Sequence, residues 1–107
     1  MHRKALLFGV LILNRNGREW LTPLYDSLRQ DGYEHKRVYL VDNASDDGSV
    51  EMTLARYPEV TVLRMPVNLG YCMAYNLAME QAVAAGCDWV SWQNNDTVVL
   101  PGWLDRL

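Results

Sequence analysis

Four short apolar runs recur along the chain, separated by longer stretches that mix apolar and polar residues. A continuous apolar run bounded by turn residues is typical of a strand that is covered on both faces, as in a parallel sheet. The runs predict strands at residues 5–13 (ALLFGVLIL), 37–41 (RVYLV), 60–65 (VTVLRM) and 89–93 (WVSWQ).

The stretches between the runs have the spacing of amphipathic helices. Residues 20–30 carry apolar side chains three or four positions apart, which predicts a helix with one buried face. Pro23 fits this helix only if it lies in the first turn, where its missing amide hydrogen costs nothing. A further helix is expected to begin at Pro101.

Two more helices are predicted in the middle of the chain. A short one precedes Pro58, with Val50, Leu54 and Tyr57 expected together on its buried face. A longer helix is predicted at residues 71–85, because this apolar and alanine-rich stretch is typical of a buried helix. Strands and helices therefore alternate through the whole sequence.

Alternating strands and helices imply an α/β fold, in which helices cover both faces of a parallel sheet in three layers. Crossover connections in such a sheet are right-handed. With 107 residues, the chain is predicted to be a single Rossmann-like domain spanning residues 1–107.

Charge and cysteine content narrow the possible partners. The net charge is -3 and the pI about 5.2, which weighs against a nucleic-acid surface, because phosphate binding needs a basic face. The apolar run near the N-terminus is shorter than the roughly 20 residues that cross a bilayer, so no membrane-spanning segment is expected. Cys72 and Cys87 have no metal-ligand spacing and are expected to be small buried residues in a reducing compartment.

Polar residues gather where each predicted strand ends. Ligands bind beyond the carboxyl ends of strands in open parallel sheets, so residues from distant parts of the sequence would meet at one rim. Strand ends also run into polar loops in proteins that bind no ligand there. Position alone therefore favours a ligand site and an ordinary polar loop equally. The residues concerned are Asn14, Arg15, Asn16, Asp42, Asn43, Asn68, Gly70, Asn94, Asn95 and Asp96.

The chemistry of these residues suggests a nucleotide ligand. The turn after the first strand has a single glycine, which disfavours a dinucleotide-binding oxidoreductase, and there is no Walker motif. Asp42 is placed to accept a hydrogen bond from a base or ribose, and Arg15 can reach a phosphate. Asp96 is a hard oxygen ligand suited to a Mg²⁺ or Mn²⁺ ion that bridges a diphosphate. Asn94 and Asn95 either complete the coordination shell of that ion or position a sugar by hydrogen bonds.

Three segments together resemble family-2 glycosyltransferases of the GT-A fold, in particular the rhamnosyltransferase-like branch. They are LVDNASDDGS, NLGYCMAYN and NNDTVVLPGWL, which occur in the family's order and cover essentially the whole chain. The resemblance implies transfer of a glycosyl group from a nucleotide-diphosphate sugar to a hydroxyl acceptor, with a divalent cation as cofactor. It also implies a cytoplasmic location, at the inner face of the membrane in the complete enzyme.

The resemblance assigns roles to individual residues. Asp42 matches the aspartate that contacts base or ribose, and Asp96 matches the metal-binding aspartate. Asn94 stands where other members carry the first aspartate of the metal motif, Asn95 replaces a common proline, and Tyr75 stands where many members have asparagine or arginine. The predicted nucleotide-binding set is Leu13, Asn14, Arg15, Asp42, Asn43, Asn68, Gly70, Tyr75, Asn94 and Asn95, with Asp96 as the metal ligand.

In the family, an acceptor-binding half follows the metal motif and supplies the catalytic base. The chain is therefore expected to be the donor-binding half, truncated before the acceptor half and without turnover on its own. One alternative is a non-catalytic nucleotide-binding or interaction module built on the same half-fold. Another is a receiver-like domain with Asp42 as phosphoacceptor, which leaves the NLGY and NNDT segments unexplained.

The resemblance also implies an uncovered edge. In the complete fold, later elements cover the fourth strand, so residues 89–104 would expose an unpaired strand edge and up to three tryptophans. Unpaired edges and large apolar patches favour association with another chain. A homodimer or higher oligomer is expected, with the contact at or near Trp92, Val98, Val99, Leu100 and Trp103.

Overall fold

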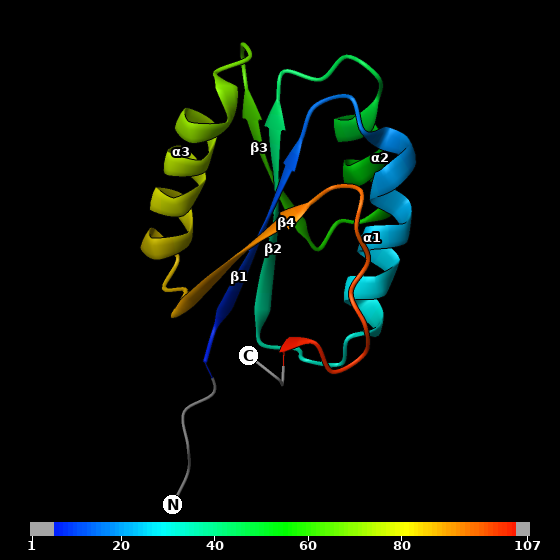
Figure 1. Cartoon of the computed structure of the whole chain (residues 1–107), viewed down its shortest axis with the longest axis vertical. Coiled ribbons are helices and arrows are strands. Elements are labelled where there is room, and N and C mark those ends of the chain that lie inside the picture. The colour runs from blue at the N-terminus through cyan, green and yellow to red at the C-terminus, as the bar shows by residue number, and fades with distance from the viewer. Residues whose placement is uncertain (1–5, 105–107) are drawn as a thin grey trace, which may run out of the picture.

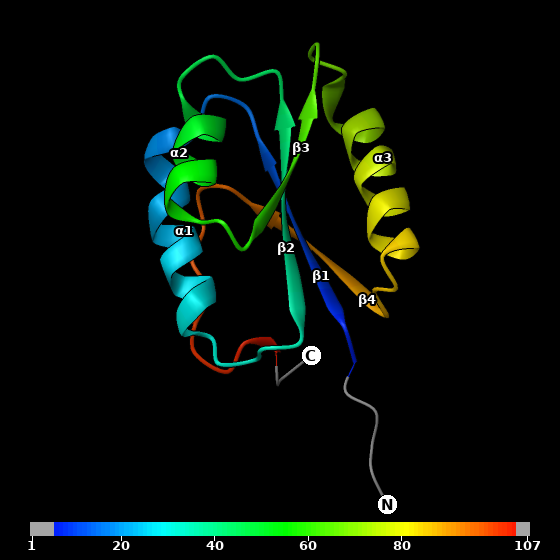
Figure 2. The ribbon, with the colours of Figure 1, turned by 180° about the vertical axis from the view of Figure 1, so that it is seen from behind.

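The computed structural model describes residues 6–104 and confirms the predicted three-layer α/β architecture. A four-stranded parallel sheet has α1 and α2 on one face and α3 on the other (Figures 1 and 2). The elements are β1 (Phe8–Asn14), α1 (Arg18–Gln30), β2 (Lys36–Asn43), α2 (Ser49–Arg56), β3 (Val60–Met65), α3 (Gly70–Ala84) and β4 (Trp89–Asn94).

The order of the strands creates a switch point in the sheet. The spatial order is β3-β2-β1-β4, so the chain moves from β1 to β3 in one direction and then crosses back to place β4 beside β1. Asn14 pairs with Asp42, and Leu13 pairs with Asn94, which brings three strand ends to the same level. The carboxyl ends of strands at such a switch point are where ligands bind in open α/β sheets.

β1 is buried on both faces, which explains its continuous apolar run. Val10 and Ile12 pack against α1 and α2, whereas Leu11 and Leu13 pack on the α3 side. Val10, Leu11 and Ile12 are 0% exposed. Complete burial of such a side chain stabilises the fold by about 1.5–3 kcal/mol relative to exposure.

α1 begins two residues before the predicted start. Pro23 consequently lies inside the helix rather than in its first turn. Its ring is on the exposed side of the helix, and the buried face is formed by Leu21, Leu24, Tyr25 and Leu28. The earlier start arises because the Asp47 side chain accepts a hydrogen bond from the Arg18 amide, an interaction between distant parts of the sequence.

The predicted buried face of α2 is wrong at Leu54, which is 60% exposed. Val50, Met52 and Thr53 are buried instead, and Tyr57 is buried just beyond the helix. The helix turns this way because the Thr53 hydroxyl hydrogen-bonds to the Tyr25 hydroxyl on α1 at 2.9 Å.

α3 lies against the sheet through small side chains, not through its large ones. Ala74, Ala78 and Ala82 are 0% exposed and form a stripe with a spacing of four residues. Small side chains let a helix approach a sheet closely, so the larger residues project outward. The expectation of a buried helix is therefore wrong for its outer face, which exposes Tyr71, Met73, Leu77, Met79 and Val83.

The two cysteines also differ from the expectation of burial. Cys72 lies on the outer side of α3 and is exposed, whereas Cys87 is partly buried near Tyr39. Burial raises the pKa of the Cys87 thiol. Neither forms a disulfide bond in the structure.

After β4 the chain runs back beside α1 towards the other end of the molecule (Figures 1 and 2). Val99 is 7% exposed and Trp103 is partly buried against the core, so the expectation that both face a partner is not met. Trp92, Val98 and Leu100 do remain exposed. Residues 101–103 form turns and Leu104 has a 3₁₀ conformation, and the remainder of the helix expected from Pro101 lies outside the described residues.

Within residues 6–104, no helix combines the length and apolar character that a bilayer crossing requires.

Candidate functional site

The ends of β1, β2 and β4 are joined by one buried side chain, Asn14. It is 0% exposed, and both ends of its amide are used. Its Nδ2 donates to Asp42 Oδ1 at 2.9 Å and to Ser45 Oγ at 3.2 Å. Its Oδ1 accepts from the Gly17 amide at 3.1 Å and from Asn95 Nδ2 at 2.9 Å. Asn14 therefore links three loops at the rim.

Gly17 makes this arrangement possible, and the sequence reasoning did not identify it. A Cβ at position 17 would lie 2.0 Å from Asn95 Nδ2 and 2.7 Å from Asn14 Oδ1, so a larger residue would have to displace the side chains that form the network. The signal for it in the sequence is that it is the lone glycine of the turn after β1.

The Asp42 carboxylate is fixed beneath the rim. The residue is 0% exposed, and its second oxygen, Oδ2, accepts from the Ser45 amide at 3.0 Å. A buried carboxylate needs such donors, because an unpaired charge in a low-dielectric interior is costly. Each carboxylate oxygen has a second lone-pair direction that these bonds leave unused.

The β1–α1 and β2–α2 loops are tied together by a second set of bonds. Arg15 Nη1 donates to the carbonyl oxygens of Asn43 and Ala44, at 2.9 and 2.7 Å. Asn16 Oδ1 accepts from the Asp46 amide at 2.8 Å. Asn16 and Ala44 both have left-handed backbones, with φ of 52° and 58°. Such a conformation costs energy at a residue other than glycine, and strain of this kind concentrates at functional sites.

Asp47 connects the amino ends of two helices. Its carboxylate accepts from the Arg18 amide at the start of α1 and from the Ser49 amide at the start of α2, both at 3.0 Å. Partial burial opposes ionisation, but the bonds from the Ser49 hydroxyl and the two amides outweigh it, so the pKa of Asp47 lies below its ordinary value. A negative charge is also favourable at a helix amino terminus.

The loop after β3 is attached to β2 through two asparagines. Asn43 Nδ2 donates to Asn68 Oδ1 at 2.7 Å, and Asn43 Oδ1 accepts from the Leu69 amide at 2.8 Å. Asn68 Oδ1 also accepts from the Gly70 amide at 3.0 Å. Gly70, where α3 begins, has φ of +75°, a conformation that favours glycine.

Asp96 projects from a turn whose neighbours are both anchored. Asn95 is bonded to Asn14, and Thr97 Oγ1 donates to the Asn94 carbonyl at 2.7 Å. Asn94 and Asp96 are themselves exposed. Within residues 6–104, no group of three or more His, Cys, Asp or Glu side chains could hold a metal ion. One exposed carboxylate fits a Mg²⁺-type ion that takes its other ligands from substrate phosphates and water.

Two members of the predicted set lie apart from this polar rim. The Leu13 side chain is 7% exposed and packs in the core, so only its backbone reaches the loop. Tyr75 lies on α3 with its ring edge-on to Trp92, the two ring centroids 3.7 Å apart. Burial raises the pKa of Tyr75. Tyr75 therefore forms part of the aromatic contact between α3 and β4.

Two clefts open at the carboxyl end of the sheet. One, of about 470 Å³, lies between α1 and α2 and is lined by residues that include Asn16, Arg18 and Asp47. The other, of about 350 Å³, lies between the β2–α2 loop and the end of β3, and it is lined by Ala44, Ser45, Arg64, Met65 and Pro66.

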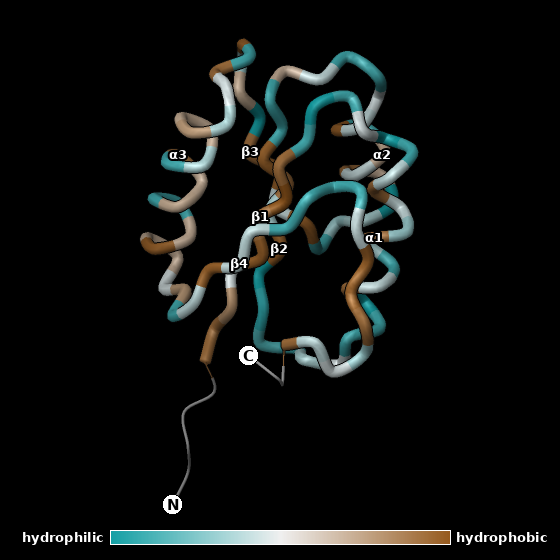
Figure 3. The backbone as a smooth tube through the Cα atoms, in the orientation of Figure 1, coloured by the Kyte–Doolittle hydropathy of each residue, from teal (hydrophilic) through white to brown (hydrophobic). Residues whose placement is uncertain are grey.

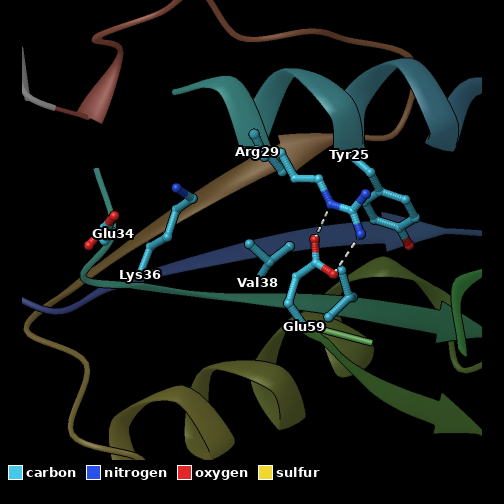
Figure 4. A pocket seen from close by; sticks show the side chains of 8 residues that line it. Tyr25, Arg29, Glu34, Lys36, Val38 and Glu59 are labelled. Carbon is cyan, nitrogen blue, oxygen red and sulfur yellow. Dashed lines mark hydrogen bonds and ion pairs between the residues drawn. The ribbon is translucent and has the colours of Figure 1, made fainter. Parts of the chain in front are cut away.

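A third cleft, of about 240 Å³, lies at the opposite end of the strands and contains none of the predicted site residues (Figure 4). Leu28, Val38 and Val60 contribute apolar surface to it, and two of the charged side chains around it pair with each other. Arg29 pairs with Glu59, and Lys36 Nζ donates to the Tyr33 carbonyl.

A family model described as glycosyl transferase family 2 matches residues 9–107. The chain belongs to this family. Curated relatives from two strains of Mycobacterium tuberculosis, CDC 1551 / Oshkosh and ATCC 25618 / H37Rv, are named N-acetylglucosaminyl-diphospho-decaprenol L-rhamnosyltransferase. They are 40% identical over 78 residues, which is 65% of this chain and 25% of theirs. The match thus spans about a quarter of the length of these relatives.

Solved structures confirm the GT-A fold of this glycosyltransferase domain. S. aureus TarS, residues 1–349, in complex with UDP-GlcNAc has a TM-score of 0.84 at 21% identity, over 94% of this chain and 30% of that one. The mannosyltransferase PcManGT from Pyrobaculum calidifontis, in complex with GDP-Man and Mn2+, has a TM-score of 0.76 at 20% identity, over 89% and 29%.

Proposed function

We propose that this glycosyltransferase domain binds a nucleotide-diphosphate sugar at the rim, as the donor for transfer of a glycosyl group to a hydroxyl acceptor. The observation that carries the proposal is the Asn14 network, which brings the Asp42 and Asp96 loops together at the switch point of the sheet. Neighbours of the same fold support it, because they are described in complex with UDP-GlcNAc and GDP-Man.

Within this proposal Asp42 meets the base or ribose, and Asn43, Asn68 and Gly70 form the adjoining wall. The backbone from Leu13 to Arg15 completes the nucleotide side, together with Asn94 and Asn95, whereas Tyr75 stays in its contact with Trp92. Because Asp42 is 0% exposed, contact requires the β2–α2 loop to move when the ligand binds. The strained backbone at Ala44 makes this loop the element that is expected to move.

Asp96 would hold a divalent cation, Mg²⁺ or Mn²⁺. Bound there with the diphosphate, the ion would stabilise negative charge on the leaving group. The Pyrobaculum neighbour, which is in complex with GDP-Man and Mn2+, supports this assignment. No base for the acceptor hydroxyl is assigned to the residues of the rim, and we expect residues 1–107 alone to show no transfer.

Calorimetry with UDP, dTDP and GDP, each with Mn²⁺, tests donor binding. Heat of binding for at least one nucleotide at millimolar concentration is expected. The absence of heat for all three would count against the proposal. A cytoplasmic location and a role in polysaccharide biosynthesis fit a nucleotide-sugar donor, and two free cysteines are usual in a reducing compartment.

The exposed edge of β4 carries a separate proposal about assembly. Trp89 is 58% exposed and Trp92 is 37% exposed along an outer strand that pairs only with β1 within the described residues. Such an edge favours pairing with another chain, and a two-fold homodimer is the default form. Light scattering at several concentrations should show a mass above 12.3 kDa that rises with concentration. A monomer of constant mass would refute it.

A further inference from the structure

The segment that follows β4, residues 95–104, is called the return segment here. It leaves the rim at Asn95 and runs beside α1 towards the opposite end of the molecule (Figure 1). Its hydrophobic stretch lies next to α1 (Figure 3). Val99 and Leu104 are 7% and 1% exposed, so this segment packs as part of the core and is not a loose tail.

Ser27 on α1 holds the middle of the return segment. Its hydroxyl accepts from the Val99 amide at 3.0 Å and donates to the Leu24 carbonyl at 2.7 Å. The second bond orients the hydroxyl, so that its lone pair faces Val99. A buried backbone amide without an acceptor is costly, and no β-strand partner is available to Val99. The serine therefore replaces the partner that a neighbouring strand would have supplied.

Asp31 holds the far end of the return segment. Its Oδ1 accepts from the Leu104 amide at 3.4 Å, and its carbonyl accepts from the Gly102 amide at 3.3 Å. The residue is 4% exposed and lies at the C-terminal end of α1. A carboxylate is unfavourable there because the helix dipole is negative at that end. Its bonds to the amides of Leu104 and Tyr33 account for its presence.

The rim end of the same segment carries Asp96, between the bonded residues Asn95 and Thr97. We propose that Ser27 and Asp31 are positioning residues of the glycosyltransferase site: by fixing the return segment along α1, they hold Asp96 where it can bind a metal ion. This rests on the metal role proposed for Asp96. Neither residue touches the ligand: Ser27 acts through the backbone between Val99 and Asp96, and Asp31 acts through the backbone between Gly102 and Asp96.

A positioned ligand binds a metal more strongly than a mobile one, because less conformational freedom is lost on binding. α1 also begins at the rim, where Asp47 bonds to its first amide. One helix thus supports the nucleotide side of the site at its N-terminus and the metal side along its length.

The test compares Ser27→Ala with Tyr25→Phe. Tyr25→Phe also removes one buried hydroxyl bond from α1, but that bond joins Thr53 of α2 and not the return segment. Ser27→Thr keeps the hydroxyl and serves as the rescue variant. Each 107-residue protein is titrated with UDP, dTDP and GDP, in Mn²⁺ and in EDTA, and amide hydrogen exchange is measured without ligand.

In Ser27→Ala the amides of residues 97–100 should exchange about tenfold faster, as expected when one buried bond is lost. The gain in nucleotide affinity on adding Mn²⁺ should fall at least threefold, while affinity in EDTA stays as in the wild type. Tyr25→Phe and Ser27→Thr should keep the wild-type gain. Asp31→Ala should reproduce Ser27→Ala, with faster exchange centred on residues 102–104.

The failures of the two proposals are distinguishable. A wild-type protein that gains no affinity from Mn²⁺ overturns the metal role of Asp96, and the positioning role built on it. If Mn²⁺ raises the nucleotide affinity of the wild type and raises that of Ser27→Ala and Asp31→Ala by the same factor, the positioning role alone is overturned. If the gain in affinity from Mn²⁺ falls equally in Tyr25→Phe, the positioning role is also overturned, because the effect would then result from a general loss of stability.

Discussion

The two ends of the sheet are built from different interactions. At the carboxyl end, Asn14, Asp42 and Asn43 are at most 3% exposed and bond to backbone amides and to one another. At the amino end, the main polar contact is the exposed pair between Arg29 and Glu59, whose side chains are 47% and 44% exposed. Buried polar networks fix a geometry and are costly to break, whereas exposed ion pairs contribute little. The contrast places the end whose geometry is specified by buried hydrogen bonds at the rim.

Asn14→Ala should produce the largest effect in either region. It removes one of the two donors to Asp42 and the acceptor of Gly17 and Asn95 in a fully buried position. Each buried group left without its partner costs about 1–3 kcal/mol, and more where that group is charged, so the free energy of unfolding from urea titration should fall by several kcal/mol. Nucleotide binding should be lost as well. If the free energy of unfolding falls no more in Asn14→Ala than in Arg29→Ala, the contrast between the two ends is wrong.

Asp42→Ala and Asp96→Ala should separate the two halves of the rim. Losing one charge-assisted hydrogen bond costs about 1.5–3 kcal/mol of binding free energy, so Asp42→Ala should weaken nucleotide binding with and without Mn²⁺. Asp96→Ala should weaken it only when Mn²⁺ is present. Calorimetry in Mn²⁺ and in EDTA measures both effects. Identical behaviour of the two variants would refute this division of roles.

Gly17→Ala tests whether the rim depends on close approach. The new Cβ would meet Asn95 Nδ2 at 2.0 Å and must displace it. Crowding of this kind costs about 1–3 kcal/mol, and the bond between Asn95 and Asn14 should break. Gly32→Ala is the control, because no atom lies within 4 Å of its Cβ and only its positive φ is disfavoured. If urea unfolding shows a larger loss of stability in Gly32→Ala than in Gly17→Ala, the close packing inferred at the rim is wrong.

Glu59→Gln should have the smallest effect, at the amino end. The pKa of Glu59 lies below its ordinary value because Arg29 hydrogen-bonds to its carboxylate. A lowered folded pKa means that its contribution is present above the unfolded value of about 4.3 and is lost as pH falls through the folded pKa. Urea unfolding should therefore show a small deficit of the variant at pH 7 that disappears at acidic pH. A deficit that grows on acidification would show the opposite linkage.

The sequence determined the fold and the location of the rim. Its apolar runs and helical stretches alternate, and that alternation admits a parallel sheet with helices on both faces. β3 has the predicted bounds, and the ends of β1, β2 and β4 deliver their polar residues to one level. These features depend on local periodicity, which a single sequence displays directly.

Other features were decided only by tertiary contacts. Leu54 and Cys72 are exposed and Val99 is buried because neighbouring elements determine which side of each segment faces the core. Arg15, Asp47 and Ser27 each have a partner that lies 28 or more residues away in the chain, and no periodicity reports such distances. Apolar patterning determines how helices and sheet form layers. Hydrogen bonds between distant loops orient the polar side chains, and these bonds can form only once the backbone has folded.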